Sequence, residues 1–260
     1  MKTRKSKILI LSGLKQDFEA TVKSASNLAK MIDAEVDFFH VKKPSEIIKK
    51  ENQLSAIRTI NREQVKLEKE LNSLLDPLKA KYAIDIKTKF TFGNVKAEIE
   101  KHINKTKPDV LVLGKRKTKL LNLPDDRVIE FVLNKFSIPV LIASNQNSIE
   151  SLDNLTIGVL NSSENLDSQA VLNKLVRQSK NPLKSFRVID KGESLTNKKN
   201  DNTVEYIFDK NDNTVNSISN YLVKSNVNLL YLNKAKDLST KVVSLREIIN
   251  KVNVPMLIAN

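Results

Sequence analysis

The sequence predicts an α/β protein built from two tandem doubly wound domains, each with a parallel sheet. The first observation is an internal repeat: residues 108–117 (PDVLVLGKRK) recur as 227–236 (VNLLYLNKAK), and residues 138–143 (IPVLIA) recur as 254–259 (VPMLIA). The second is the alternation of short apolar runs with amphipathic stretches, which is typical of β-α-β units with right-handed crossovers. One unit is therefore written twice in this chain.

The repeat also sets the expected domain boundaries. We expect one domain over residues 1–148 and a second, degenerate copy over residues 149–260. The connection between them, residues 145–154, is polar and lacks apolar periodicity, as a linker does. The last strands of the two repeats are edge strands in such a fold, so we expect them to pair or lie close across the interface, with Pro139 and Pro255 equivalent.

In the first repeat, short apolar runs alternate with helical patterns. Phe18, Val22 and Ala25 begin a three-to-four-residue spacing that predicts an amphipathic helix, with Asp17 as its N-cap. The predicted strands cover residues 7–11, 35–41, 84–92, 110–113 and 140–143, and the predicted helices cover 17–33, 45–81, 94–106 and 127–135.

The helical pattern over residues 45–81 is unusually long. Asp76-Pro77 predicts a kink, so we expect at least two helical pieces there. Its Leu/Ile stripe is expected to pack on the sheet; the alternative is that part of this face docks another chain.

The second repeat follows the same alternation without the long helix. In place of that helix, residues 191–203 form a polar stretch that predicts a surface loop. The predicted elements cover residues 155–160, 168–179, 185–189, 204–208, 215–224, 229–232, 240–251 and 256–259.

Charge and composition restrict the class of protein. At 260 residues, 40% apolar and 28% charged, the chain is expected to fill two ordinary globular cores. Residues 1–148 carry 29 basic and 18 acidic side chains, so most of the net charge of +14 lies in the first repeat. Such an imbalance favours an anionic ligand, a nucleic acid or a membrane surface, or reflects solvated lysine faces. The apolar run at residues 8–11 is too short for a signal peptide, and no cysteine is present, so we expect a cytoplasmic protein without disulfides.

Several segments, in register, resemble the universal stress protein family in its tandem form. The resemblance is carried by KILIL at the start, Phe39-His40-Val41, residues 93–99 (GNVKAEI), residues 108–114 (PDVLVLG) and residues 138–142 (IPVLI). It implies Rossmann-like domains with strand order 3-2-1-4-5 and, in many members, ATP held at the carboxyl ends of the strands.

The same resemblance implies a site, from which this sequence departs at four positions. ATP-binding members carry an acidic residue after strand one and a loop of the form Gly-x-x-Gly, about nine residues, then Gly-Ser/Thr. Here Gly13 occupies the acidic position, Lys117 the second glycine, and Asp126-Arg127 the final pair. The residues that would contact a nucleotide or another anion are Gly13, Val41, Gly114, Lys115, Arg116, Lys117 and Arg127.

Two interpretations of this basic loop stay open. Its cations could bind phosphate through side-chain charge at a helix start, or they could solvate a loop whose nucleotide site has decayed. In the second repeat Asn233 replaces Gly114, and we expect no nucleotide there.

Other chemistries have little support in the sequence. His40 and His102 are the only histidines and lack a cluster of acidic residues at ligand spacing, so we expect no metal. No serine stands in a Gly-x-Ser-x-Gly context, and the basic loop contains no aromatic residue for stacking a base, so we expect neither an enzyme nor a nucleic-acid reader.

The predicted function is therefore a non-enzymatic stress-response protein that acts as a binding or scaffold module, with no resident cofactor. The alternative is a regulator that binds ATP through the first domain. We expect an intramolecular pseudo-dimer, with homodimerisation open, an adenine nucleotide or another anion as the small ligand, an unidentified protein partner and no contact with a membrane.

Overall fold

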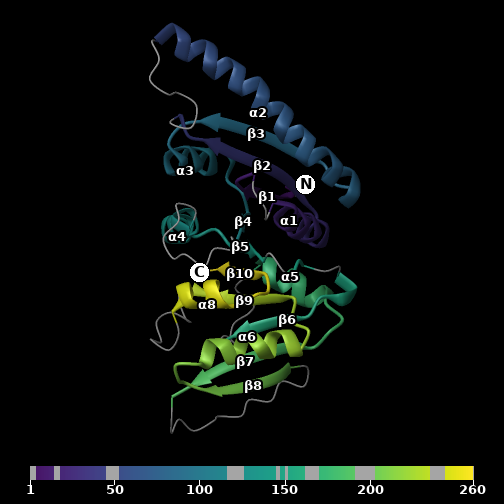
Figure 1. Cartoon of the computed structure of the whole chain (residues 1–260). Coiled ribbons are helices and arrows are strands. Elements are labelled where there is room, and N and C mark those ends of the chain that lie inside the picture. The colour runs from purple at the N-terminus through teal and green to yellow at the C-terminus, as the bar shows by residue number, and fades with distance from the viewer. Residues whose placement is uncertain are drawn as a thin grey trace.

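The computed structural model describes residues 4–14, 18–44, 53–115, 126–144, 147–149, 152–161, 170–190, 203–234 and 244–259. Its strands form one continuous ten-stranded sheet in the order β3-β2-β1-β4-β5-β10-β9-β6-β7-β8 (Figure 1). The strands are β1 Ser6–Leu11, β2 Ala34–Lys42, β3 Ile86–Phe92, β4 Val110–Gly114, β5 Val140–Ala143, β6 Ile157–Leu160, β7 Leu183–Ile189, β8 Thr203–Asp209, β9 Leu229–Asn233 and β10 Met256–Ala259. The predicted order 3-2-1-4-5 is confirmed in each half.

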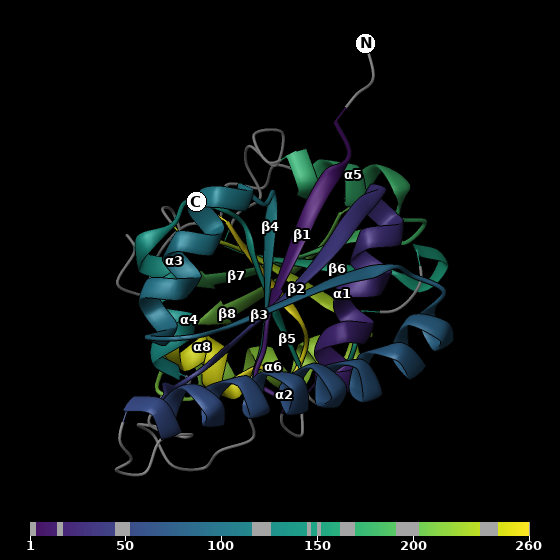
Figure 2. The same ribbon diagram turned by 90° about the horizontal axis from the view of Figure 1, so that it is seen from above.

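Helices cover both faces of this sheet. The helices are α1 Phe18–Ile32, α2 Gln53–Tyr82, α3 Val95–Thr106, α4 Asp126–Lys135, α5 Ala170–Gln178, α6 Thr214–Lys224 and α8 Leu245–Lys251, with a short 3-10 turn at Leu152–Asn154. The core contacts place α1, α2 and α5 on one face and α3, α4, α6 and α8 on the other. Figure 2 shows the strands fanning between these two layers with a strong twist.

The two halves join through their last strands, as the sequence predicts. β5 and β10 pair antiparallel, with Ile142 opposite Met256, Leu141 opposite Leu257 and Val140 opposite Ile258. Every other strand pair in the sheet is parallel. The antiparallel pairing covers two edges that would otherwise leave unpaired backbone groups.

The two prolines that precede these strands have equivalent roles. The carbonyl of Pro139 accepts a hydrogen bond from the amide of Leu111 at 2.9 Å, and that of Pro255 accepts one from Leu230 at 2.9 Å. The predicted equivalence of Pro139 and Pro255 is therefore confirmed.

Both hydrophobic cores extend across the junction between the halves. One core combines Ile8 and Leu141 with Leu257, and the other combines Leu9 with Met256. Successive residues of a strand point to opposite faces, so the part of a strand that is buried on both faces must be apolar, as β1 from Ile8 to Leu11, β4 and β5 are. Burial of both faces therefore stabilises the two halves as one packed unit.

The prediction of two helical pieces over residues 45–81 is wrong for the described part, because α2 is one helix with Pro77 inside it. Proline removes one intrahelical hydrogen bond, which opposes continuity. The buried face nonetheless runs on across it: Leu71 and Leu75 are fully buried and Leu78 is 8% exposed. Packing of these leucines outweighs the local cost of the proline. Residues 45–52 of that prediction lie outside the described residues.

The expected linker does more than separate the two halves, because one of its residues packs in the core. Ile149 is fully buried in the core on the α1 face, and its carbonyl accepts a hydrogen bond from Asn27 Nδ2 at 2.7 Å. This residue therefore fixes the connection against α1. The boundary between residues 148 and 149 stays a prediction, and the N-cap at Asp17 and the loop at 191–202 lie outside the described residues.

Candidate nucleotide site and the interface beside it

The predicted site lies where the strand order reverses, at the carboxyl ends of β1 and β4. In open α/β sheets this switch point is the usual place for a ligand. Gly13, Val41, Gly114 and Lys115 are described there. Arg116 and Lys117 lie outside the described residues. Arg127 is the second residue of α4, and its side chain lies outside the description too.

The turn after β1 carries no carboxylate at Gly13, which is exposed. Its backbone is tied to β2, because His40 Nδ1 lies 3.0 Å from the carbonyl oxygen of Ser12. A carbonyl can only accept, so this contact requires the proton on Nδ1. The Ser12 hydroxyl in turn donates to the carbonyl of Gly13 at 2.8 Å. The polar groups of this turn thus serve its own geometry.

Gly114 is a glycine for a steric reason. A Cβ atom built on it would lie 2.6 Å from Thr21 Oγ1, and its φ does not fall in the left-handed region. Thr21 belongs to α1 and is fully buried. The residue therefore lets α1 approach the end of β4 closely, independently of any phosphate contact.

Val41 is half-buried at the end of β2. It pairs in register with Thr91 of β3 and packs against the core on the α3 and α4 face. Its side chain therefore has a packing role in this structure.

Lys115 sends its amine to the other half of the molecule. Nζ donates to the carbonyl oxygens of Asn250 and Val252, each at 2.9 Å, at the carboxyl end of α8. Burial lowers the pKa of Lys115 from its ordinary 10.5 to about 8. The two carbonyl acceptors favour the charged amine and offset part of this effect. The first cation of the basic loop is therefore engaged in the interface.

The second half returns the same contact. Lys234 follows β9 as Lys115 follows β4, and its Nζ donates to the carbonyl of Leu133 in the last turn of α4. Sequence reasoning missed this pair. The available signal was that both copies of the repeat keep the lysine while the glycine before it becomes Asn233.

Further polar contacts cross between the halves on both faces of the sheet. Ser144 Oγ and Asn147 Nδ2 both donate to the carbonyl of Asn253 at 2.8 Å. On the other face, Lys174 of α5 donates to the carbonyl of Ile32, which ends α1. The halves are thus joined by hydrogen bonds as well as by the shared sheet.

The histidines are used structurally. The ring of His102 stacks on Phe39, with 3.9 Å between centroids and 5° between planes, and burial is the main cause that lowers its pKa. Among the residues described, no three His, Cys, Asp or Glu side chains gather as a metal site would require. Within the same ranges, no helix has the length and apolar character to cross a membrane.

Taken together, fold and junction define a class: tandem doubly wound α/β units fused into an intramolecular pseudo-dimer. The sequence matches the Universal stress protein family over residues 6–144, so the chain belongs to that family. No curated protein matches the sequence.

Solved structures share the architecture over nearly the whole chain. A universal stress protein from Archaeoglobus fulgidus DSM 4304 aligns with a TM-score of 0.69 at 16% identity, covering 98% of both chains. A putative universal stress protein from Pseudomonas aeruginosa UCBPP-PA14 aligns with a TM-score of 0.57 at 12% identity, covering 97% of this chain and 92% of the other. Identities this low support the shared fold and carry nothing about ligands.

Proposed function

We propose that this protein is a non-enzymatic, cytoplasmic binding or scaffold module of the stress response, with a degenerate nucleotide site. The observation that carries the proposal is the engagement of Lys115 with the carbonyls of Asn250 and Val252. A lysine ammonium has three donors, and the helix-terminal carbonyls take two of those of Lys115, so the position of this amine is fixed by the interface. The first cation of the loop is thus committed to holding the halves together.

The other positions of the site support the same reading. Gly13 supplies no carboxylate for a ribose or a metal ion, and the loop has Lys117 and Asp126 where glycines would let backbone amides approach phosphate oxygens. Gly114 is accounted for by its contact with Thr21. The nucleotide contacts are thus reduced while the two halves stay joined through β5 and β10, which supports a scaffold role over a nucleotide-dependent one.

One observation favours a second candidate, a regulator that binds ATP. Arg127 is the second residue of α4, and the start of a helix attracts anions. Together with Arg116 and Lys117 it could hold phosphates by charge alone.

Isothermal titration calorimetry of the full chain with magnesium ATP distinguishes the two candidates. The scaffold proposal predicts no binding heat up to millimolar ATP. Micromolar binding that is lost in the double variant Lys117→Ala/Arg127→Ala would overturn it. The matched control is Lys236→Ala/Lys241→Ala, which removes the same charge from the corresponding loop of the second half.

A further inference from the structure

The carboxyl ends of α4 and α8 each receive a lysine from the opposite half of the molecule. Lys115 of the first half contacts α8 of the second, and Lys234 of the second contacts α4 of the first. The two lysines occupy equivalent positions, each directly after the fourth strand of its repeat. The contact is therefore reciprocal and obeys the pseudo-twofold symmetry of the repeat.

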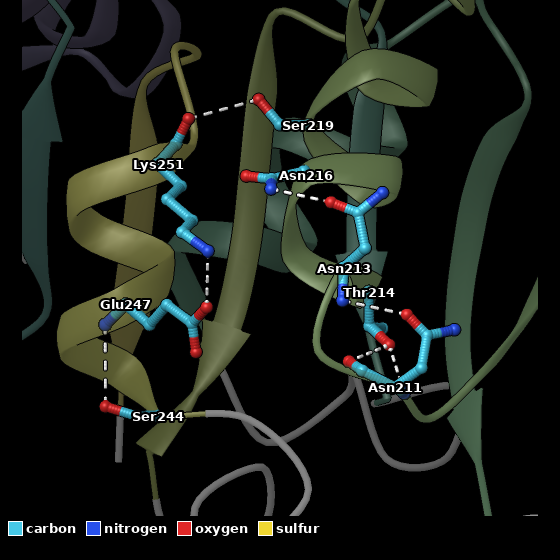
Figure 3. A network of polar contacts seen from close by, with 8 residues as sticks. All are labelled: Asn211, Asn213, Thr214, Asn216, Ser219, Ser244, Glu247 and Lys251. Atoms are coloured by element: carbon cyan, nitrogen blue, oxygen red, sulfur yellow. Dashed lines mark hydrogen bonds and ion pairs between the residues drawn. The ribbon is translucent and has the colours of Figure 1, made fainter.

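These carbonyls have electrostatic reason to take a cation. The last four carbonyls of a helix have no partner within it and carry partial negative charge. At α8, Ser219 Oγ of α6 donates to the carbonyl of Lys251 at 3.2 Å (Figure 3). Lys115 satisfies the carbonyls on either side of it, those of Asn250 and Val252. The end of α8 is thus held between its own half and the first half.

We propose that Lys115 and Lys234 form a hydrogen-bonded clasp between the two halves, so that removing either amine loosens the helix end that it holds in the opposite half. The clasp lies on the α4 and α8 face only. β5 and β10 remain paired beside it, and Lys174 holds Ile32 on the other face. Loss of the clasp therefore loosens one face and leaves the sheet joined.

The charged side chains of α4 and α8 that the structure describes pair with one another or with α3. Arg246 pairs with Glu130 at 3.6 Å, Lys251 with Glu247 at 2.7 Å, and Lys135 with Glu100 at 3.1 Å. Within the described residues, no carboxylate is paired with Lys115 or Lys234 in these contacts. The two amines bond backbone carbonyls, so acylation, which leaves one N–H donor and adds bulk, would disrupt the clasp without breaking an ion pair.

The clasp gives the basic loop a role that is independent of whether ATP binds. Lys115 is the first residue of the loop after β4, so a change that removes its N–H donors would be transmitted to α8 in the other half. This goes beyond the scaffold proposal and would hold equally for the ATP-binding alternative.

Amide hydrogen exchange by NMR on the full chain tests the clasp through a crossed pattern. The reporters are two amides in the last helical turns, Val252, which donates to Ile248 at 2.9 Å, and Phe136, which donates to Val132 at 3.1 Å. Lys115→Met should speed exchange at Val252 about tenfold and leave Phe136 unchanged; Lys234→Met should do the reverse. Lys115→Arg keeps the charge and should retain most of the protection.

The matched control is Lys184→Met. Lys184 also donates to a carbonyl after a helix, that of Ser225 following α6, but within one half. This substitution should loosen the end of α6 and leave the exchange rates of the Val252 and Phe136 amides unchanged. Changes confined to the half that carries the substitution, or equal exchange in folded variants and wild type, would overturn the proposal. If one of the two methionine variants fails to fold, the other tests the same reciprocity from the opposite side.

Discussion

The ends of β4 and β9 occupy equivalent positions in the two repeats, and they differ in the residue that ends the strand. The first half has Gly114-Lys115 and the second has Asn233-Lys234. The lysine is kept in both, because each amine reaches a helix end in the opposite half. The glycine is kept only where α1 presses Thr21 against it. Lysine serves the interface at this point, and glycine serves local packing.

At a second position the glycine is in the second half and a larger residue is in the first. Gly158 of β6 pairs in register with Leu230, and Leu9 of β1 pairs with Leu111. Gly158 therefore stands in the second half where Leu9 stands in the first. A Cβ on Gly158 would lie 3.0 Å from Val227 Cγ1 and 3.1 Å from Phe186 Cε2. In the first half this position holds the side chain of Leu9. In the second half Val227 and Phe186 fill the corresponding space. Gly114 and Gly158 therefore both mark places where packed groups approach a strand closely.

Exchanging the strand-end residues between the halves gives the largest expected effect. Gly114→Asn should lower the free energy of unfolding by about 1–3 kcal/mol, because the new Cβ collides with buried Thr21. Asn233→Gly should cost less, about 0.5–1 kcal/mol, from added backbone freedom. Urea denaturation of both variants measures the difference. Equal losses would contradict the steric account of Gly114.

The buried amine of Lys115 predicts a pH dependence. Its folded pKa, about 8, lies below the ordinary 10.5, so the charged amine disfavours the folded state below pH 8. This destabilisation fades as the pH rises from about 8 to 10.5. The stability of the wild type minus that of Lys115→Met should therefore increase over that window. Denaturation at several pH values measures it, with Lys184→Met as the reference; a flat or falling difference would count against a desolvated amine.

The surface ion pair between the halves should contribute least. Arg246 and Glu130 lie 3.6 Å apart with side chains 58% and 50% exposed. Their coupling in a double-mutant cycle of Glu130→Gln and Arg246→Gln should be about 0.2–1 kcal/mol and decrease with salt. A larger coupling would mean that this ion pair, and not Lys115 and Lys234, makes the main polar contribution to stability at this face.

Much of this fold could be predicted from the sequence because its signals are local. Continuous apolar runs such as those of β1 and β4, and the repeat of Pro139 at Pro255, specify buried parallel strands and their equivalence. The pairing of β5 with β10 followed from the need to cover two edges. Element ends shifted by a few residues, as in β3, which begins at Ile86 and not at Ile84.

What the sequence could not supply depends on contacts between distant residues. Pro77 predicts a break when read locally, and only the packing of Leu71 and Leu78 keeps α2 continuous. The partners of Lys115 are more than 130 residues away along the sequence. A local cluster of cations therefore predicts an anion site and not this contact. Ile149 lies within the polar stretch 145–154, and only its burial against α1 shows that it belongs to the core.

Amine reactivity at Lys115 decides whether this lysine serves the interface or a phosphate. Limited acetylation of the native chain, followed by mass spectrometry, gives a rate for each lysine, with exposed Lys101 as the internal reference. The lowered pKa of Lys115 raises the neutral, reactive fraction of its amine, so the test is the effect of ATP: millimolar ATP should leave the ratio of the Lys115 rate to the Lys101 rate unchanged. A fall of this ratio when ATP is added would contradict the assignment of Lys115 to the interface.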